Sequence, residues 1–117
     1  MVKRIAYTMY PVVDMARARK FYEEELGLAA AAEYANGQWV EYDAGGIFAL
    51  TTMAAVKPSA NSGGNIAFEV EDVVAFTEQL KAKGVTVLLG VTETPAFRMS
   101  VVLDSEGNAL TLCQQNG

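Results

Sequence analysis

The pattern of apolar and polar residues switches from strand-like to helical and back, twice along the chain. Residues 4–13 are mostly apolar, β-branched or aromatic, which is typical of a strand. Asp14 then suits a helix N-cap, and apolar residues recur at helical spacing as far as Gly27, which suits a helix C-cap. The first quarter of the chain therefore predicts a strand followed by a short helix with one buried face.

Turn signals divide the next stretch into three further strands. Asn36-Gly37 is a strong hairpin signal, and Ala44-Gly45-Gly46 is a second turn. Residues 57–64 combine Pro, Gly and small polar residues and are interpreted as a linker. The predicted strands are 28–34, 38–43 and 47–53.

The same order of elements repeats after the linker. Asp72 is predicted to cap a second helix that ends at Gly84, and Asp104 to Gly107 suits a turn between the last two strands. Gly90 suggests a bulge. The predicted strands are 65–70, 85–91, 98–103 and 108–114.

This repeat, with a period of about 60 residues, predicts an α+β fold of two βαβββ modules. The modules cover residues 1–56 and 65–117. A half of this size cannot bury its own sheet face, so we expect both modules to pack into one small domain.

Composition narrows the possible functions. The chain of 117 residues has 9 basic and 14 acidic residues, a net charge of −5, and no basic stripe, which argues against nucleic acid as a partner. No apolar run is long enough to span a bilayer and no apolar leader is present, so we expect no membrane association. The single cysteine, Cys113, makes a cytoplasmic location the expectation. The chain has no histidine, which excludes Ser-His-Asp triads and imidazole metal sites.

Three features together resemble the vicinal oxygen chelate superfamily, which includes glyoxalases, bleomycin resistance proteins and extradiol dioxygenases. They are the strand followed by Asp at the start of each half, the segment 21–28 (FYEEELGL) and the segment 103–112 (LDSEGNALTL). The resemblance implies paired βαβββ modules whose sheets curl around a cavity. Metalloenzymes of the family hold a divalent metal there with His, Gln or Glu.

The metal-ligand positions implied by the resemblance carry other residues in this chain. Counting back from each capping Asp gives Tyr7 and Asn65, and counting on from each turn Asp gives Leu50 and Thr111. A phenol, an amide, a hydroxyl and an alkyl group are poor ligands for such a cation. We therefore expect no metal and no other cofactor, as in the dimeric, metal-free bleomycin resistance proteins.

Alternation of side chains along the strands extends this set to a cavity wall. Residues two positions from these four, and their hairpin partners, are expected to point the same way. Val40 and Tyr42 are the expected hairpin partners of Leu50 and Phe48. A bulge in the strand 38–43 would reverse the direction of its side chains, so that Trp39 and Glu41 point into the cavity instead. The predicted ligand-binding residues are Tyr7, Met9, Trp39, Tyr42, Phe48, Leu50, Asn65, Glu69, Met99 and Thr111.

Three functions remain open at this point. The first is a homodimeric binder that sequesters an aromatic or cationic antibiotic or metabolite. The second is a lyase, isomerase or dioxygenase-type enzyme that uses a carboxylate or Tyr7 in place of a His-based metal site. The third is a structural or regulatory domain without a small ligand. The modules can pair within one chain or by exchange between two chains. Glu23, Glu24 and Glu25 are interpreted as a solvated helix face.

Overall fold

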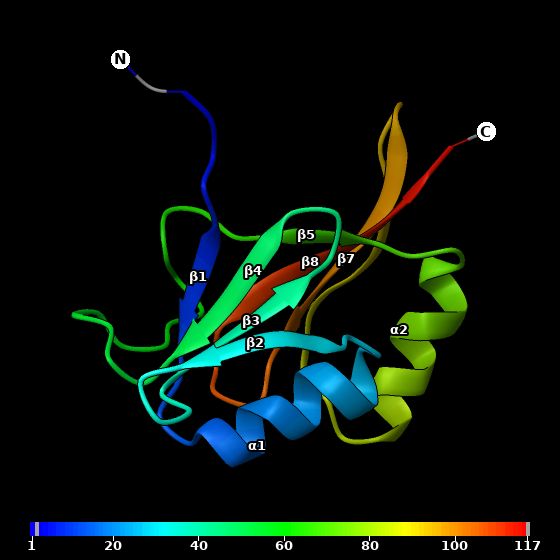
Figure 1. Ribbon diagram of the computed structural model, residues 1–117. Helices are drawn as coiled ribbons and strands as arrows, with labels where there is room; N and C mark the ends of the chain where they lie inside the picture. Colours follow the sequence, from blue (N-terminus) through cyan, green and yellow to red (C-terminus); the bar gives the residue numbers. More distant parts are fainter. Residues whose placement is uncertain (2, 117) are drawn as a thin grey trace. The chain divides into compact units, whose positions relative to one another are not determined.

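The computed structural model describes residue 1 and residues 3–116. The chain divides into two compact units, Met1–Pro58 and Ser59–Gly117, with the boundary inside the stretch predicted as a linker. Each unit has one four-stranded sheet and one helical segment, so the fold is α+β with two similar modules (Figure 1). No helix in the described part of the chain is both long enough and apolar enough to cross a membrane.

The first unit has the strand order β1-β4-β3-β2, with β1 parallel to β4 and the other pairs antiparallel. The Asp14 side chain accepts a hydrogen bond from the Arg17 backbone N–H at 3.0 Å, so the predicted N-cap is confirmed. The helix continues as a π-helical turn, η1, before Gly27 leaves it with a φ of +77°. The elements are β1 (Thr8–Pro11), α1 (Met15–Lys20), η1 (Phe21–Glu25), β2 (Ala30–Tyr34), β3 (Trp39–Asp43) and β4 (Ile47–Thr51).

The second unit repeats this topology with the order β5-β8-β7-β6. Asp72 caps its helix by accepting a hydrogen bond from the Ala75 backbone N–H at 3.0 Å. The pairing of β6 with β7 shifts between Leu89 and Thr92, which confirms the bulge predicted around Gly90. The elements are β5 (Ala67–Glu69), α2 (Val73–Ala82), β6 (Val87–Glu93), β7 (Phe97–Leu103) and β8 (Ala109–Gln115).

Two sequence expectations need correction. The first strand of each unit is shorter than predicted, because only Thr8–Pro11 and Ala67–Glu69 pair with a neighbouring strand. Each sheet is also open, with β1 and β2 as the edges of one and β5 and β6 as the edges of the other. Neither sheet therefore encloses a cavity by closing on itself.

The turn between β7 and β8 is held by a hydrogen-bond network around Asp104 and Asn108. One Asp104 carboxylate oxygen accepts from the backbone N–H groups of Glu106 and Asn108, each at 2.8 Å. The other accepts from the Asn108 side-chain amide at 3.0 Å, and the Asn108 side-chain oxygen accepts from the Ser59 backbone N–H at 3.1 Å. Both side chains are buried. The Asp-x-x-Gly-Asn segment therefore ties the start of the unit to its last hairpin.

We expect Asn108→Ala to lower the free energy of unfolding by about 1–3 kcal/mol, because it leaves the buried Asp104 carboxylate and the Ser59 N–H short of a partner. Urea denaturation followed by circular dichroism measures this. Asn61→Ala, at an exposed position two residues after Ser59, is the matched control and should change stability by less than about 0.5 kcal/mol. Equal midpoints for the two variants would show that the network contributes nothing to stability.

Candidate functional site

The helix-facing side of the first sheet is a packed core. The Tyr42 hydroxyl donates to a Glu23 carboxylate oxygen at 2.8 Å, and the Phe48 ring lies 5.1 Å from the Tyr22 ring. Tyr42, Phe48 and Leu50 are each at most 1% exposed. The prediction that these three residues line a wall together with Tyr7 is therefore wrong: they face α1 and η1.

The error comes from the length of one turn. In the first unit Asp43 pairs with Ile47, so three residues form the turn, whereas Leu103 pairs with Ala109 in the second unit and five residues form the turn. Counting seven residues from each turn Asp therefore reaches different faces of the two sheets, since neighbouring side chains on a strand point opposite ways. The register with the first strand of each unit makes Ala49 the counterpart of Thr111.

The opposite face of this sheet carries Tyr7, Met9, Trp39 and Glu41. Met9 and Glu41 both pair with Ala49, which places all three on one face of neighbouring strands. The Tyr7 and Trp39 rings meet edge to face, with their centroids 5.3 Å apart. Trp39 and Glu41, rather than Val40 and Tyr42, therefore share a face with Met9, and the pairing of β3 with β4 contains no bulge.

The Trp39 indole is fixed in place by Glu41. Its Nε1–H donates to Glu41 Oε2 at 2.8 Å, and both side chains are half-buried. Tyr7 keeps half of its surface, 51%, exposed. This face therefore offers two aromatic rings and one carboxylate. Glu41 stands two residues after Trp39 on β3, and this spacing is the signal in the sequence for its place on the same face.

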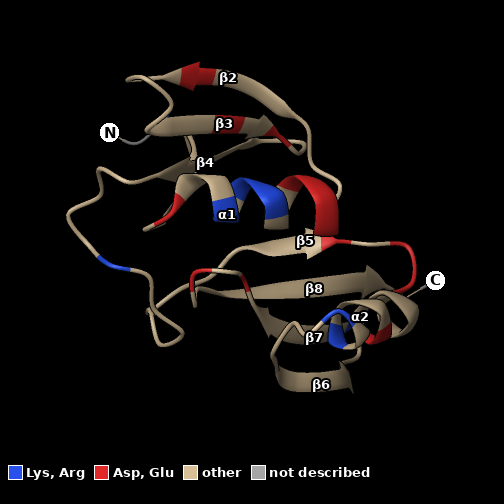
Figure 2. Ribbon diagram, turned by 90° about the horizontal axis from the view of Figure 1, so that it is seen from below, with Lys and Arg blue, Asp and Glu red and all other residues tan. Residues whose placement is uncertain are grey.

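The acidic end of the first helix is structural rather than freely solvated, which corrects the interpretation of Glu23. Arg19 Nε donates to Glu23 at 2.6 Å, and Arg19 also pairs with Glu33 on β2. Figure 2 shows basic positions in blue along α1, followed by acidic positions in red at the end of the helical segment. The Arg19 hydrogen bond holds the pKa of Glu23 below its usual value. Burial, and then the bond to Glu23, raise the pKa of Tyr42. These charges hold η1 against the sheet and do not reach the opposite face.

In the second unit the predicted residues do share one face. Thr111 pairs with Ala67, and Cys113 pairs with both Glu69 and Met99, so the side chains of Glu69, Met99 and Thr111 lie on the side away from α2. Thr111 Oγ1 donates to Asn65 Oδ1 at 3.1 Å. Burial, and then the charge of Glu69, raise the pKa of Cys113. A raised pKa lowers the thiolate fraction at neutral pH, which fits an unreactive thiol.

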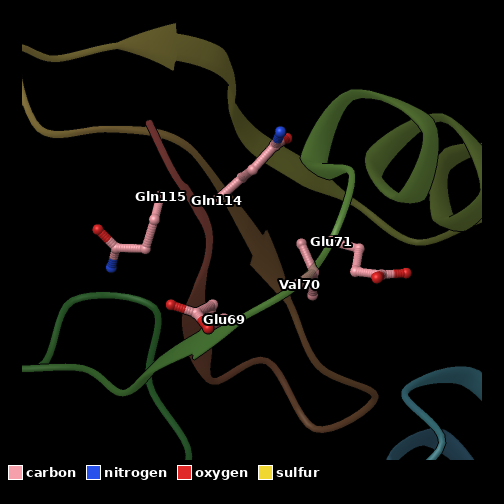
Figure 3. A pocket seen from close by; sticks show the side chains of 5 residues that line it. All are labelled: Glu69, Val70, Glu71, Gln114 and Gln115. Carbon is pink, nitrogen blue, oxygen red and sulfur yellow. The ribbon is translucent and has the colours of Figure 1, made fainter. Parts of the chain in front are cut away.

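A hollow of about 300 Å³ opens where β5 and β8 end side by side. Its walls are polar. One lining residue, Gln114, is already hydrogen-bonded, since its side-chain oxygen accepts from the Val73 backbone N–H at the start of α2. No aromatic side chain contributes to it. Figure 3 shows the lining residues Glu69, Val70, Glu71, Gln114 and Gln115.

The residues at the implied metal-ligand positions do not fit a divalent metal. In the first unit Ala49 occupies the position that corresponds to Thr111. Its methyl group cannot bind a metal, so Tyr7 has no second ligand there. In the second unit Asn65 and Thr111 are neutral groups that already bond to each other. Among the described residues no three His, Cys, Asp or Glu side chains group closely enough to hold a metal ion. A phenol, an amide and a hydroxyl are weak ligands for first-row cations.

Comparison with known proteins gives a consistent picture of the fold. A family model described as the Glyoxalase/Bleomycin resistance protein/Dioxygenase superfamily matches residues 4–112. The uncharacterized protein YetH of Bacillus subtilis is 27% identical over 96% of this chain and 98% of its own length.

Two solved structures with this fold differ in what they do. TnmS3, an antibiotic binding protein from Streptomyces sp. CB03234, is 26% identical, with a TM-score of 0.80 and 98% of each chain covered. The trypanothione-dependent glyoxalase I of Leishmania major is 24% identical, with a TM-score of 0.75, and the match covers 97% of this chain and 87% of that chain. The likeness to the Leishmania enzyme shows the fold alone.

The assignment of the two sheet faces can be tested by stability. We expect Phe48→Ala to lower the free energy of unfolding by about 3–5 kcal/mol, because the ring is 1% exposed in a packed core. Tyr7→Ala should cost under about 1 kcal/mol, because half of that ring is already in water. Chemical denaturation of both variants measures the difference, and equal losses would contradict this assignment.

Proposed function

Since the chain belongs to the glyoxalase/bleomycin resistance protein/dioxygenase superfamily, we propose that it binds a flat aromatic small molecule without a metal ion and releases it unchanged. The binding face is the side of the first sheet that carries Tyr7, Met9 and Trp39. The proposed role is sequestration of an antibiotic or metabolite.

The observation that carries this proposal is the Tyr7–Trp39 pair. Two rings at 5.3 Å and 83° form a corner with one ring half-exposed, and a third flat ring can stack in such a corner. Exposed aromatic surface fixed in one orientation is costly to leave in water and favours a ligand that covers it.

Two further findings support binding without chemistry. The positions that would hold a catalytic metal carry neutral donors or none, as described above. The similar antibiotic binding protein TnmS3 has the same fold over nearly its whole length. A chain that keeps the fold and lacks the ligand set is suited to holding a molecule rather than activating it.

A thermal-shift panel tests the proposal. The panel contains bleomycin, planar aromatic antibiotics and the chlorides of Mg²⁺, Mn²⁺, Ni²⁺ and Zn²⁺. A ligand at 100 times its dissociation constant adds about 2.7 kcal/mol, which for a domain of this size raises Tm by on the order of 10 °C. We expect a shift with an aromatic compound and none with a metal, and we expect mass spectrometry to recover the compound unchanged.

Variants locate the effect. Trp39→Ala should abolish the ligand-induced shift relative to its own unliganded Tm, and Tyr7→Ala should reduce it. Leu88→Ala removes an exposed apolar side chain from β6 in the other unit and should leave the shift intact. A shift produced by a divalent metal, or a chemically altered compound, would overturn the proposal in favour of an enzyme.

We further propose that the protein is a homodimer, as expected from the resemblance to dimeric binders. Light scattering at micromolar concentration should give twice the mass of 12.6 kDa. A monomeric mass with the ligand bound would show that one chain suffices for binding.

A further inference from the structure

We infer that Glu41 makes the aromatic face of the first sheet selective for organic cations, so that the ligand is a planar ring system bearing a positive charge rather than a neutral or anionic one. This inference rests on the proposed function, since it names the charge class of the molecule bound at Tyr7 and Trp39.

The first step is position. Glu41 and Trp39 lie two residues apart on β3 and so project from the same face of the sheet. Their side chains are joined by the bond from the indole Nε1–H to Oε2 at 2.8 Å, which places the carboxylate at the rim of the indole ring. A molecule stacked on the indole therefore lies within a few ångströms of the carboxylate, at about the range of a direct charge interaction.

The second step is charge. The partner of this carboxylate is a neutral N–H, so the bond leaves its negative charge in place. Salt bridges join Arg19 to Glu23 and Glu33, and Arg98 to Glu93, and none of these three involves Glu41. No Lys or Arg occurs between residues 30 and 56, the stretch that contains β2, β3 and β4. The binding face therefore carries a carboxylate with no protein cation on its own strands.

The third step is the kind of ligand that the indole ring and the carboxylate attract together. A cation over an indole or phenol ring is attracted by the ring electrons, and a carboxylate beside the ring adds a direct charge interaction. Half-burial of Glu41 strengthens both attractions by excluding part of the solvent. An anion in the same place meets the carboxylate at short range and is repelled.

The bond has a second consequence, which is positional. It fixes the rotation of the indole, so the edge-to-face contact with Tyr7 exists before a ligand arrives. Glu41 therefore acts both as a charge and as a positioning residue for Trp39. These two roles are separable, because a glutamine keeps an acceptor oxygen and loses the charge.

The experiment uses the indole N–H resonance of the only tryptophan in the chain, Trp39, in ¹⁵N-labelled protein. It is titrated at neutral pH with N-methylquinolinium, a permanent cation, and with quinoline, its neutral counterpart. We expect wild type to bind the cation about tenfold more tightly than the neutral ring. Glu41→Gln should bind both equally while keeping the indole resonance near its wild-type position. Glu41→Ala should also move that resonance in the unliganded protein.

Glu24→Gln is the matched control, because it removes the same charge from an exposed position on η1 and should retain the tenfold preference. If wild type binds quinoline as tightly as N-methylquinolinium, or if Glu41→Gln keeps the preference, the inference is wrong while the proposed aromatic binding stands. If neither compound, nor any aromatic antibiotic of the thermal-shift panel, perturbs the Trp39 resonance, the proposed function itself fails.

Discussion

The pairing of β4 with its two neighbours is the interaction on which the candidate site depends. β4 lies between β1 and β3, and its register decides which of their residues share a face. Because side chains alternate along a strand, a shift of one residue exchanges the face that packs against the helix for the opposite face. In the observed register the core receives Tyr42, Phe48 and Leu50, and the aromatic pair is left on the other side.

The two units share one architecture but carry different side chains on the face away from the helix. Each begins with a strand, a capping Asp and a helix, and each pairs its first strand in parallel with its last. The face away from the helix carries Tyr7, Trp39 and Glu41 in the first unit. In the second it carries Glu69, Met99, Cys113 and the bonded Asn65–Thr111 pair. The first unit therefore carries the features of a stacking site, although both share the fold.

The carboxylates of the first unit fall into two groups, according to whether their hydrogen-bond partner is charged or neutral. Glu23 and Glu33 are both held by Arg19, and Glu23 also accepts from the Tyr42 hydroxyl, so each carboxylate has a cationic partner within the protein. Glu41 accepts only a neutral N–H from Trp39 among the described residues. A carboxylate with a cationic partner stabilises a structure, whereas one without such a partner favours a cationic ligand.

Local signals in the sequence determined the order of elements, the two helix caps and the turns, because N-capping by Asp14 and Asp72 and positive φ at Gly27, Gly84 and Gly107 depend only on nearby backbone. Alternation also placed Glu69, Met99 and Thr111 together in the second unit. Only the tertiary structure decided the faces of the first unit, because the difference in turn length became visible only through strand pairing. The indole–carboxylate bond and the Arg19 network likewise needed coordinates, since neighbours across strands are set by register, which residue spacing along the chain does not encode.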